Sequence, residues 1–275
     1  MSFRGAIKLC IRGVARGLAK TYTGRQVYEQ LLEAGMGVNV PVKYGDVDMV
    51  FASPNALTQY RAASFSSKEP ETLTWLEGIP SDAVLWDVGA NVGLYSVYAA
   101  KRNNARVFAF EPSFFNLELL ARNVFLNELQ ERVTVVPVAL SNVLGPSLFK
   151  MSSTSWGGAL STFGQDFDQH GGKLNSIFEY QTMGMTMDVA VRLLGILPPR
   201  FIKIDVDGIE HFILSGGTTV LKQVESVLVE INDDFAEQAE ESTRLLVSAG
   251  LVLKKKCEMP GAGNQYNQWW VRSNL

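Results

Sequence analysis

Two short segments of the chain carry residue types that could bind a ligand and act on it. The first, Asp87-Val88-Gly89-Ala90-Asn91-Val92-Gly93, lies between an apolar run and a segment of helical periodicity. Its small residues let the backbone approach a ligand, and the N-terminus of the following helix offers unpaired N–H groups. Glu111 ends the next apolar run, where an acid can accept hydrogen bonds from both ribose hydroxyls. Together these features predict a site for an adenosine-containing cofactor.

The loop departs from the dinucleotide-binding fingerprint G-x-G-x-x-G. Asn91 stands at the position of the middle glycine, and no third glycine follows. Asp87 precedes the loop, where its charge would repel a pyrophosphate and attract an ammonium group. S-adenosylmethionine carries that ammonium and no phosphate, so electrostatics favours it. The alternatives are an NAD-dependent oxidoreductase, a non-catalytic module that has kept the fold, and a tight turn that binds no ligand.

The second segment, Lys203-Ile204-Asp205, lies at the end of a predicted strand. Lys203 and Asp205 share one face of that strand, at the carboxyl end of the sheet where ligands of such folds bind. We expect Asp205 to act as a general base or to orient the acceptor, and Lys203 to tune its charge or stabilise a developing alkoxide. Glu230 ends the next strand and is the third catalytic candidate. A structural ion pair is the alternative for Lys203 and Asp205.

Neither a metal site nor a catalytic histidine is predicted. Asp205, Glu230 and Asn232 could supply oxygen ligands for magnesium, but signatures made of oxygen ligands alone are weak. No metal is therefore expected. We expect His170 at the surface, and we expect His211 to complement neighbouring carboxylates.

The elements that position these residues alternate between strands and helices. Strands are expected at residues 84–88, 106–110, 133–140, 201–206 and 226–231, each followed by a chain segment of helical or irregular pattern. This alternation predicts an α/β fold with a parallel sheet covered on both faces. Two β-rich runs at 251–257 and 265–271 predict a C-terminal antiparallel hairpin, which completes a mostly parallel seven-stranded sheet.

Two regions lie outside this alternation. Residues 152–186 are rich in Ser, Gly, Asn and Gln without clear elements, which is typical of a functional lid on the substrate side. Residues 1–66 are predicted to form an extension of helix and β-hairpin, with strands at 38–42 and 47–52. Residues 67–275 are predicted to form the main domain.

The first helix, residues 3–20, has a basic and an apolar side. Arg4, Lys8, Arg12, Arg16 and Lys20 recur at every fourth residue, and Ile7, Ile11, Val14 and Leu18 gather on another face. Peripheral contact with an anionic membrane is one interpretation. The favoured one is that the apolar stripe packs on the chain's own domain.

Composition limits the class of protein further. The chain has 275 residues, 47% of them hydrophobic, and a net charge of −3, so a sizeable core is expected and nucleic acid is not. No run reaches the roughly 20 apolar residues of a membrane span, and no signal peptide is recognisable. Cys10 and Cys257 stand far apart, in no spacing typical of a metal site or a disulfide framework, which favours a cytoplasmic location. Peripheral contact with the inner face of a membrane is compatible with that location.

The two segments resemble, in combination, the FkbM family of methyltransferases. Asp87 to Gly93 followed by Phe110-Glu111-Pro112 is similar to the paired cofactor motifs of that family. Phe201 to Glu210 and Val227 to Ile231 resemble its later motifs. The resemblance spans about residues 69–231. Asp207 departs from it, because the family commonly has glutamate there.

The resemblance implies a Rossmann-like class I methyltransferase fold and an enzyme that transfers a methyl group from S-adenosyl-L-methionine, usually to an oxygen of a carbohydrate or natural product. A small molecule or a glycan is therefore the expected acceptor. The residues that the resemblance and the loop assign to cofactor binding are Glu69, Asp87, Gly89, Asn91, Gly93, Glu111, Asn116 and Ala139.

Overall fold

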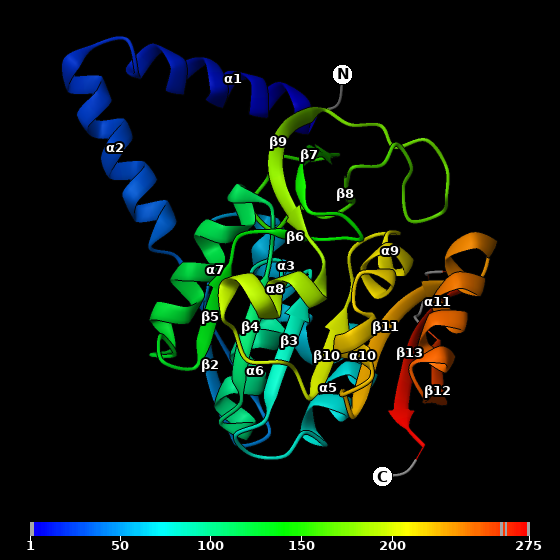
Figure 1. The fold of residues 1–275 in the computed structure, drawn as a ribbon. Helices are drawn as coiled ribbons and strands as arrows, with labels where there is room; N and C mark the ends of the chain where they lie inside the picture. Colours follow the sequence, from blue (N-terminus) through cyan, green and yellow to red (C-terminus); the bar gives the residue numbers. More distant parts are fainter. Residues whose placement is uncertain (1–2, 259–260, 262, 274–275) are drawn as a thin grey trace.

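A mostly parallel sheet of seven strands forms the centre of the molecule (Figure 1). The computed structural model describes residues 3–258, 261 and 263–273. The strand order is β12-β13-β11-β10-β3-β4-β5, and β13 runs antiparallel to both of its neighbours. The strands are β3 (Val84–Val88), β4 (Arg106–Phe110), β5 (Val133–Val136), β10 (Phe201–Ile204), β11 (Ser226–Asn232), β12 (Leu251–Glu258) and β13 (Gln265–Arg272). The predicted Rossmann-like sheet with its C-terminal antiparallel hairpin is confirmed.

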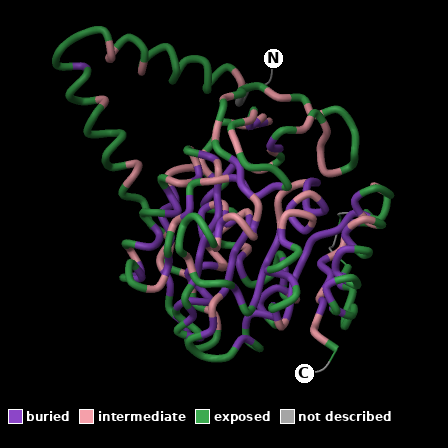
Figure 2. Tube along the Cα trace, in the orientation of Figure 1, coloured by how far each residue is buried: buried purple, intermediate pink, exposed green. Residues whose placement is uncertain are grey.

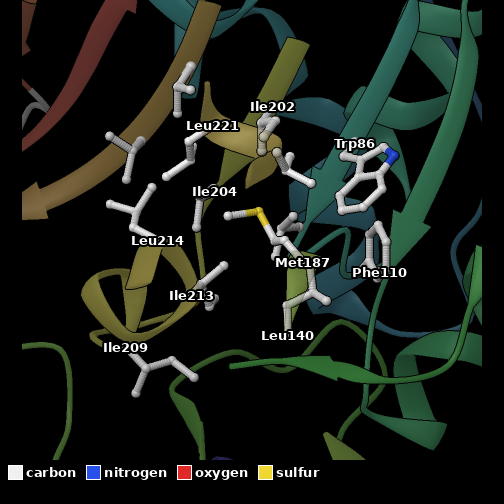
Figure 3. Close-up of a cluster of buried hydrophobic side chains, with 14 of the residues drawn as sticks. Trp86, Phe110, Leu140, Met187, Ile202, Ile204, Ile209, Ile213, Leu214 and Leu221 are labelled. Carbon is white, nitrogen blue, oxygen red and sulfur yellow. The ribbon is translucent and has the colours of Figure 1, made fainter. Parts of the chain in front are cut away.

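Successive residues of the central strands point to opposite faces, and each face has its own core. One core packs Trp86, Ile202 and Ile204 against four helices of the C-terminal half of the chain. Figure 3 shows Met187 and Ile213 pointing toward these strand residues. The helices are α8 (Met187–Leu194), α9 (Glu210–Ser215), α10 (Thr218–Leu221) and α11 (Ala236–Ser248).

The opposite face is covered by helices and by an N-terminal hairpin. The hairpin residues Met49 and Phe51 are each 1% exposed and lie in one cluster with Leu85 of the sheet. Asn123 accepts a hydrogen bond from the backbone of Ala52 at 2.7 Å and holds the hairpin edge in place. The elements are β1 (Asn39–Tyr44), β2 (Val47–Ala52), α3 (Ala56–Ala63), α4 (Phe65–Lys68), α5 (Pro70–Glu77), α6 (Leu94–Asn103) and α7 (Phe114–Leu126).

The insert between the third and fourth parallel strands forms a second sheet of order β6-β9-β7-β8. Its strands are β6 (Ala139–Leu140), β7 (Gly145–Met151), β8 (Ser161–Phe163) and β9 (Phe178–Met185). The expectation that residues 152–186 lack clear elements is therefore wrong. A small surface sheet can leave one side in water, so its strands need no continuous apolar run.

The first two helices, α1 (Phe3–Leu18) and α2 (Tyr22–Met36), project from the body of the molecule (Figure 1). Figure 2 shows both helices as mainly exposed. Ile7, Ile11 and Val14 are 44%, 62% and 59% exposed, so the prediction that the apolar stripe packs on its own domain is wrong. Among the described helices, none has the length and apolar character needed to cross a membrane.

Candidate active site

The loop after β3 adopts backbone conformations that its residue types permit. Gly89 has φ +82°, and a Cβ there would lie 1.9 Å from the carbonyl oxygen of Asp205. Asn91 has φ +51°, a left-handed conformation that Asn tolerates better than most residues. Gly93, with φ +81°, is the N-cap residue of α6. The glycines thus let the loop turn sharply and lie directly against the end of β10.

Glu111 is fixed at the end of β4 by two backbone donors. The N–H groups of Asn91 and Ser113 each donate to one carboxylate oxygen at 2.8 Å. Burial raises the pKa of Glu111 to about 7, although these two donors act in the opposite direction. The side chain of Asn116 also lowers this pKa through a hydrogen bond, and the Glu111 side chain lines the main cavity. Glu111 is therefore placed to accept hydrogen bonds from a ligand diol.

Three adjoining spaces lie at the carboxyl ends of the parallel strands. The main cavity, of about 270 Å³, is lined by Asn91, Glu111, Asn116, Asp205 and Glu230, among others. An apolar slot of about 40 Å³ is lined by Ala139 and by further apolar side chains, which are Val88, Phe110, Val138, Leu140, Phe149, Phe163, Val206 and Ile209. An inner cavity of about 50 Å³ is lined by Glu69, Lys203 and Asp205 together with the glycine loop.

Lys203 and Asp205 form an ion pair at the end of β10, with 2.9 Å between Nζ and Oδ2. Burial alone would raise the pKa of Asp205, but Lys203 and Lys68 outweigh it and lower that pKa. Burial also opposes the charge of Lys203, but Asp205 and Asp87 outweigh it and raise the pKa of the ammonium. Both groups are therefore charged at neutral pH, in a place where a ligand can reach them.

Glu230 lies on β11, beside β10, and lines the main cavity. It is 6% exposed and accepts a hydrogen bond from Gln265 of β13. Burial and the nearby carboxylate of Asp205 raise the pKa of Glu230 well above its ordinary value. Asp205 and Glu230 thus line the main cavity together, whereas Lys203 lines only the inner cavity and contacts Asp205 through their ion pair.

The remaining predicted cofactor residues occupy different positions. Glu69 lines the inner cavity and pairs with Lys68 at 2.6 Å. Asp87 is 1% exposed and lines none of the three spaces; the hydroxyl of Ser96 donates to its Oδ2 at 2.5 Å. Direct contact between Asp87 and a ligand ammonium stays a prediction. The charge of Asp87 acts on the site indirectly, because it raises the pKa of Lys203, which lines the inner cavity.

The insert covers the main cavity and forms hydrogen bonds with two of the residues predicted to bind the cofactor. The carbonyl oxygen of Gly158 accepts from the side chains of Asn91 at 2.8 Å and Asn116 at 3.1 Å. Asp207, after β10, accepts from the backbone N–H groups of Leu160 at 2.7 Å and Ser161 at 3.3 Å. These bonds hold residues 157–161 over the cavity. That the insert acts as a lid stays a prediction.

Sequence reasoning missed Arg61 and Lys68, which line both polar cavities. Arg61 lies on α3, and its Nε donates to the carbonyl oxygen of Gly157 at 2.7 Å. It makes no ion pair with any residue in the described part of the chain. Both cations lie outside the glycine loop and the Lys203 segment. The sequence signal that could have indicated them was their position shortly before Glu69, a predicted cofactor residue.

The histidines take no part in this cavity's lining. His170 is exposed, and its Nδ1 lies 2.9 Å from the amide nitrogen of Asn232. His211 is 2% exposed and stacks on Phe212 with 4.0 Å between ring centroids. Burial lowers its pKa, and the nearby carboxylates of Glu237 and Glu241, which His211 was expected to complement, act in the opposite direction. Within the described ranges, no group of three or more His, Cys, Asp or Glu side chains is arranged to hold a metal ion.

The three spaces fit a ligand with a flat apolar end, a diol and a cationic end. The apolar slot suits an aromatic base, and Glu111 lines the adjoining main cavity, where it could meet a ribose. Glu69 offers a carboxylate to a cationic group at the other end. S-adenosylmethionine fits this donor set.

Comparison with known proteins agrees with this geometry. Residues 87–253 match the model of the methyltransferase FkbM domain. The chain is 30% identical over 180 residues to the hexuronic acid methyltransferase AglP of Haloferax volcanii, a match that covers 64% of this chain and 66% of AglP. It is 34% identical over 71 residues to methyltransferase sdnD of Sordaria araneosa, covering 26% of this chain and 27% of sdnD. The chain thus spans less than two thirds of the length of these curated relatives.

Among solved structures, the chain is similar to methyltransferase FkbM from Methylobacillus flagellatus KT. That alignment has a TM-score of 0.47 and 15% identity, and it covers 70% of this chain and 44% of the other. TYW2 of P. horikoshii, solved in complex with MeSAdo, aligns with a TM-score of 0.48 and 11% identity over 84% of this chain and 69% of the other.

The family match covers more than half of the chain. It includes the glycine loop, Glu111, the Lys203–Asp205 pair and Glu230. The methyltransferase motifs predicted from the sequence are thereby confirmed, and the oxidoreductase alternative has no support. The chain belongs to the FkbM family of S-adenosylmethionine-dependent methyltransferases.

Proposed function

We propose that this protein transfers the methyl group of S-adenosylmethionine to a hydroxyl oxygen of a carbohydrate or related natural product. The observation that carries the proposal is the carboxylate of Asp205, which is paired with Lys203 and lines the same cavity as the glycine loop and Glu111. When bound, the cofactor supplies a methyl group already activated by its sulfonium. Catalysis then depends mainly on holding an acceptor oxygen in line with that methyl group.

The proposed cofactor contacts follow the three spaces. Ala139 lies beside the adenine in the apolar slot, and Glu111 accepts from the ribose hydroxyls. The glycine loop and Glu69 face the amino-acid end. Asn116 contributes by holding Gly158, the lid residue that its side chain contacts at 3.1 Å.

The proposed acceptor contacts centre on Asp205. Its lowered pKa keeps it ionised, so it can accept a hydrogen bond from the acceptor hydroxyl and orient the oxygen. Lys203 holds Asp205 in place and offsets negative charge that develops on that oxygen. Glu230, whose pKa is raised, is the group of higher proton affinity in the same cavity. We propose that Asp205 or Glu230 accepts the proton that the acceptor hydroxyl loses.

An acidic sugar is the acceptor class we propose to test first. The relative AglP is named a hexuronic acid methyltransferase. In this chain Arg61 lines the main cavity without an ion-pair partner among the described residues. A guanidinium in that position can bind the carboxylate of a uronic acid through two parallel hydrogen bonds.

We propose a cytoplasmic location because the two cysteines are free thiols. Cys10 is exposed and Cys257 is buried, and neither is part of a disulfide among the described residues. Chains without disulfides are typical of reducing compartments.

The activity is tested by transfer from cofactor labelled in its methyl group to a series of hexuronic acids and neutral hexoses. We expect labelled product from a uronic acid. We expect Asp205→Asn to lower kcat about 100-fold or more while the affinity for S-adenosylhomocysteine stays within threefold. Asp233→Asn, an exposed carboxylate outside the cavity, is the matched control and should transfer normally. Full turnover by Asp205→Asn would refute the role of Asp205.

A further inference from the structure

Helix α1 carries a charge that the rest of the chain does not share. The first 28 residues hold six of the 25 Lys and Arg residues and no Asp or Glu, which leaves 19 basic against 28 acidic residues in the remainder. Lys8, Arg12 and Arg16 recur every fourth residue, so they follow one side of α1. A strongly basic element is thus attached to an acidic body.

The same helix has an apolar side that the described structure leaves in water. Ile7, Ile11 and Val14 lie within one sector of the helical wheel, beside the basic stripe, and all three are exposed. A helix with such a stripe normally buries it in its own domain. The neighbour α2 also exposes Leu31, at 62%, and does not cover the stripe.

The position of α1 relates it to the active site. In Figure 1, α1 extends past the end of the molecule where β7 and β9 lie, and the loop between β7 and β8 covers the main cavity. An external surface bound by α1 would therefore face the end of the protein that carries the main cavity, and not the end where the parallel strands begin.

We propose that α1 docks the protein flat on an anionic phospholipid bilayer. The aliphatic stripe enters the interfacial region while the basic stripe meets lipid phosphates and carboxylates. A nucleic acid would satisfy the basic side chains and leave the apolar stripe in water. A lipid surface is complementary to both sides of the helix at once. The inference is independent of the acceptor and of the reaction.

The test is cosedimentation of the full chain with vesicles of phosphatidylcholine alone and with 30% phosphatidylglycerol. We expect binding only to the anionic vesicles, and weaker binding in 0.5 M than in 0.1 M NaCl, because salt screens the attraction. Arg12→Glu with Arg16→Glu should weaken binding about tenfold or more. Ile7→Ser with Ile11→Ser should weaken it to a similar extent, because the apolar area is lost.

Matched controls change the same residue classes elsewhere on the surface. Arg106→Glu with Lys222→Glu alters net charge equally, and Phe125→Ser with Val247→Ser removes exposed apolar side chains of α7 and α11. These controls should bind like the wild type, and all variants should keep their thermal stabilisation by S-adenosylhomocysteine. The proposal is overturned if the wild-type protein ignores anionic vesicles, binds neutral ones equally, or responds equally to control and α1 variants. A dimer that only the α1 variants disrupt, without vesicle binding, would assign the helix to a second copy of the chain.

Discussion

At the scale of single residues, the site depends on carboxylates whose protonation the fold controls. Asp205 is held ionised by Lys203, whereas Glu111, Asp207 and Glu230 have raised pKa values in the same cavity. A ligand that carries an ammonium and a sulfonium would favour the ionised form of each of these groups. Cofactor binding and carboxylate ionisation are therefore expected to be linked.

Glu111 gives the clearest case of this linkage. Its pKa of about 7 means that most of it is protonated at pH 6 and ionised at pH 8, and the ionised form is the better acceptor for ribose hydroxyls. We expect the affinity for S-adenosylhomocysteine, measured by calorimetry, to rise roughly tenfold across that interval. Glu111→Gln should bind more weakly and lose this part of the pH dependence.

The ligand's amino group titrates equally with both proteins, so the ratio of the two affinities isolates Glu111. The exposed Glu118→Gln on α7 serves as the control. A ratio that stays constant between pH 6 and pH 8 would contradict the assignment of Glu111.

The sequence predicted these residues unevenly, for physical reasons. Glu111, Asp205 and Glu230 follow strands of a parallel sheet, and such strand ends meet at one edge. Arg61 and Lys68 come from α3 and α4. The periodicity of a sequence does not reveal that these helices lie against the glycine loop. Asp87 matches the motif, yet its burial below the loop could be seen only with Ser96 and Lys203 in place.

At the scale of elements, the lid is the part whose structure the sequence did not predict. Strands β7, β8 and β9 pair with one another on the surface, so their polar side chains hide the alternation that buried strands show. The strands of the central sheet were predictable because burial on both faces requires continuous apolar runs. The exposure of the apolar stripe of α1 was not predictable, because periodicity reveals an apolar face but not what that face packs against.

Asp207 is predicted to keep the lid closed. Removing its carboxylate frees the backbone N–H groups of Leu160 and Ser161. Asp207 has φ +62°, so Asp207→Gly removes the side chain without adding backbone strain. We expect amide hydrogen exchange in residues 153–164 to speed up about tenfold or more in this variant.

The control for this experiment is Glu128→Gly, an exposed acid at a similar φ of +58°. It should leave exchange in residues 153–164 unchanged. Equal protection in Asp207→Gly and the wild type would show that Asp207 does not hold the lid.

At the scale of the whole molecule, the buried acids predict how stability depends on pH. Burial raises the pKa of Glu111 and Glu210 to about 7, against 4.5 for an ordinary glutamate. Between these values the folded chain binds more protons than the unfolded chain. The free energy of unfolding of the ligand-free protein should therefore fall as the pH rises from 5 to 7.5.

Urea denaturation at these two pH values measures the effect. Glu210→Gln should flatten the dependence, because a neutral amide carries no such linkage, while the exposed Glu240→Gln should not. Higher stability at pH 7.5 than at pH 5 would contradict the raised pKa values.

The central claim is that the spaces at the end of the sheet bind S-adenosylmethionine and not a dinucleotide. Thermal unfolding of the full chain with S-adenosylhomocysteine or with NADH tests it most directly. At 100 times its Kd, a ligand that binds only the folded state adds about 2.7 kcal/mol, which raises Tm by several degrees. We expect S-adenosylhomocysteine to produce this shift and NADH to produce none. Stabilisation by NADH without stabilisation by S-adenosylhomocysteine would contradict the account.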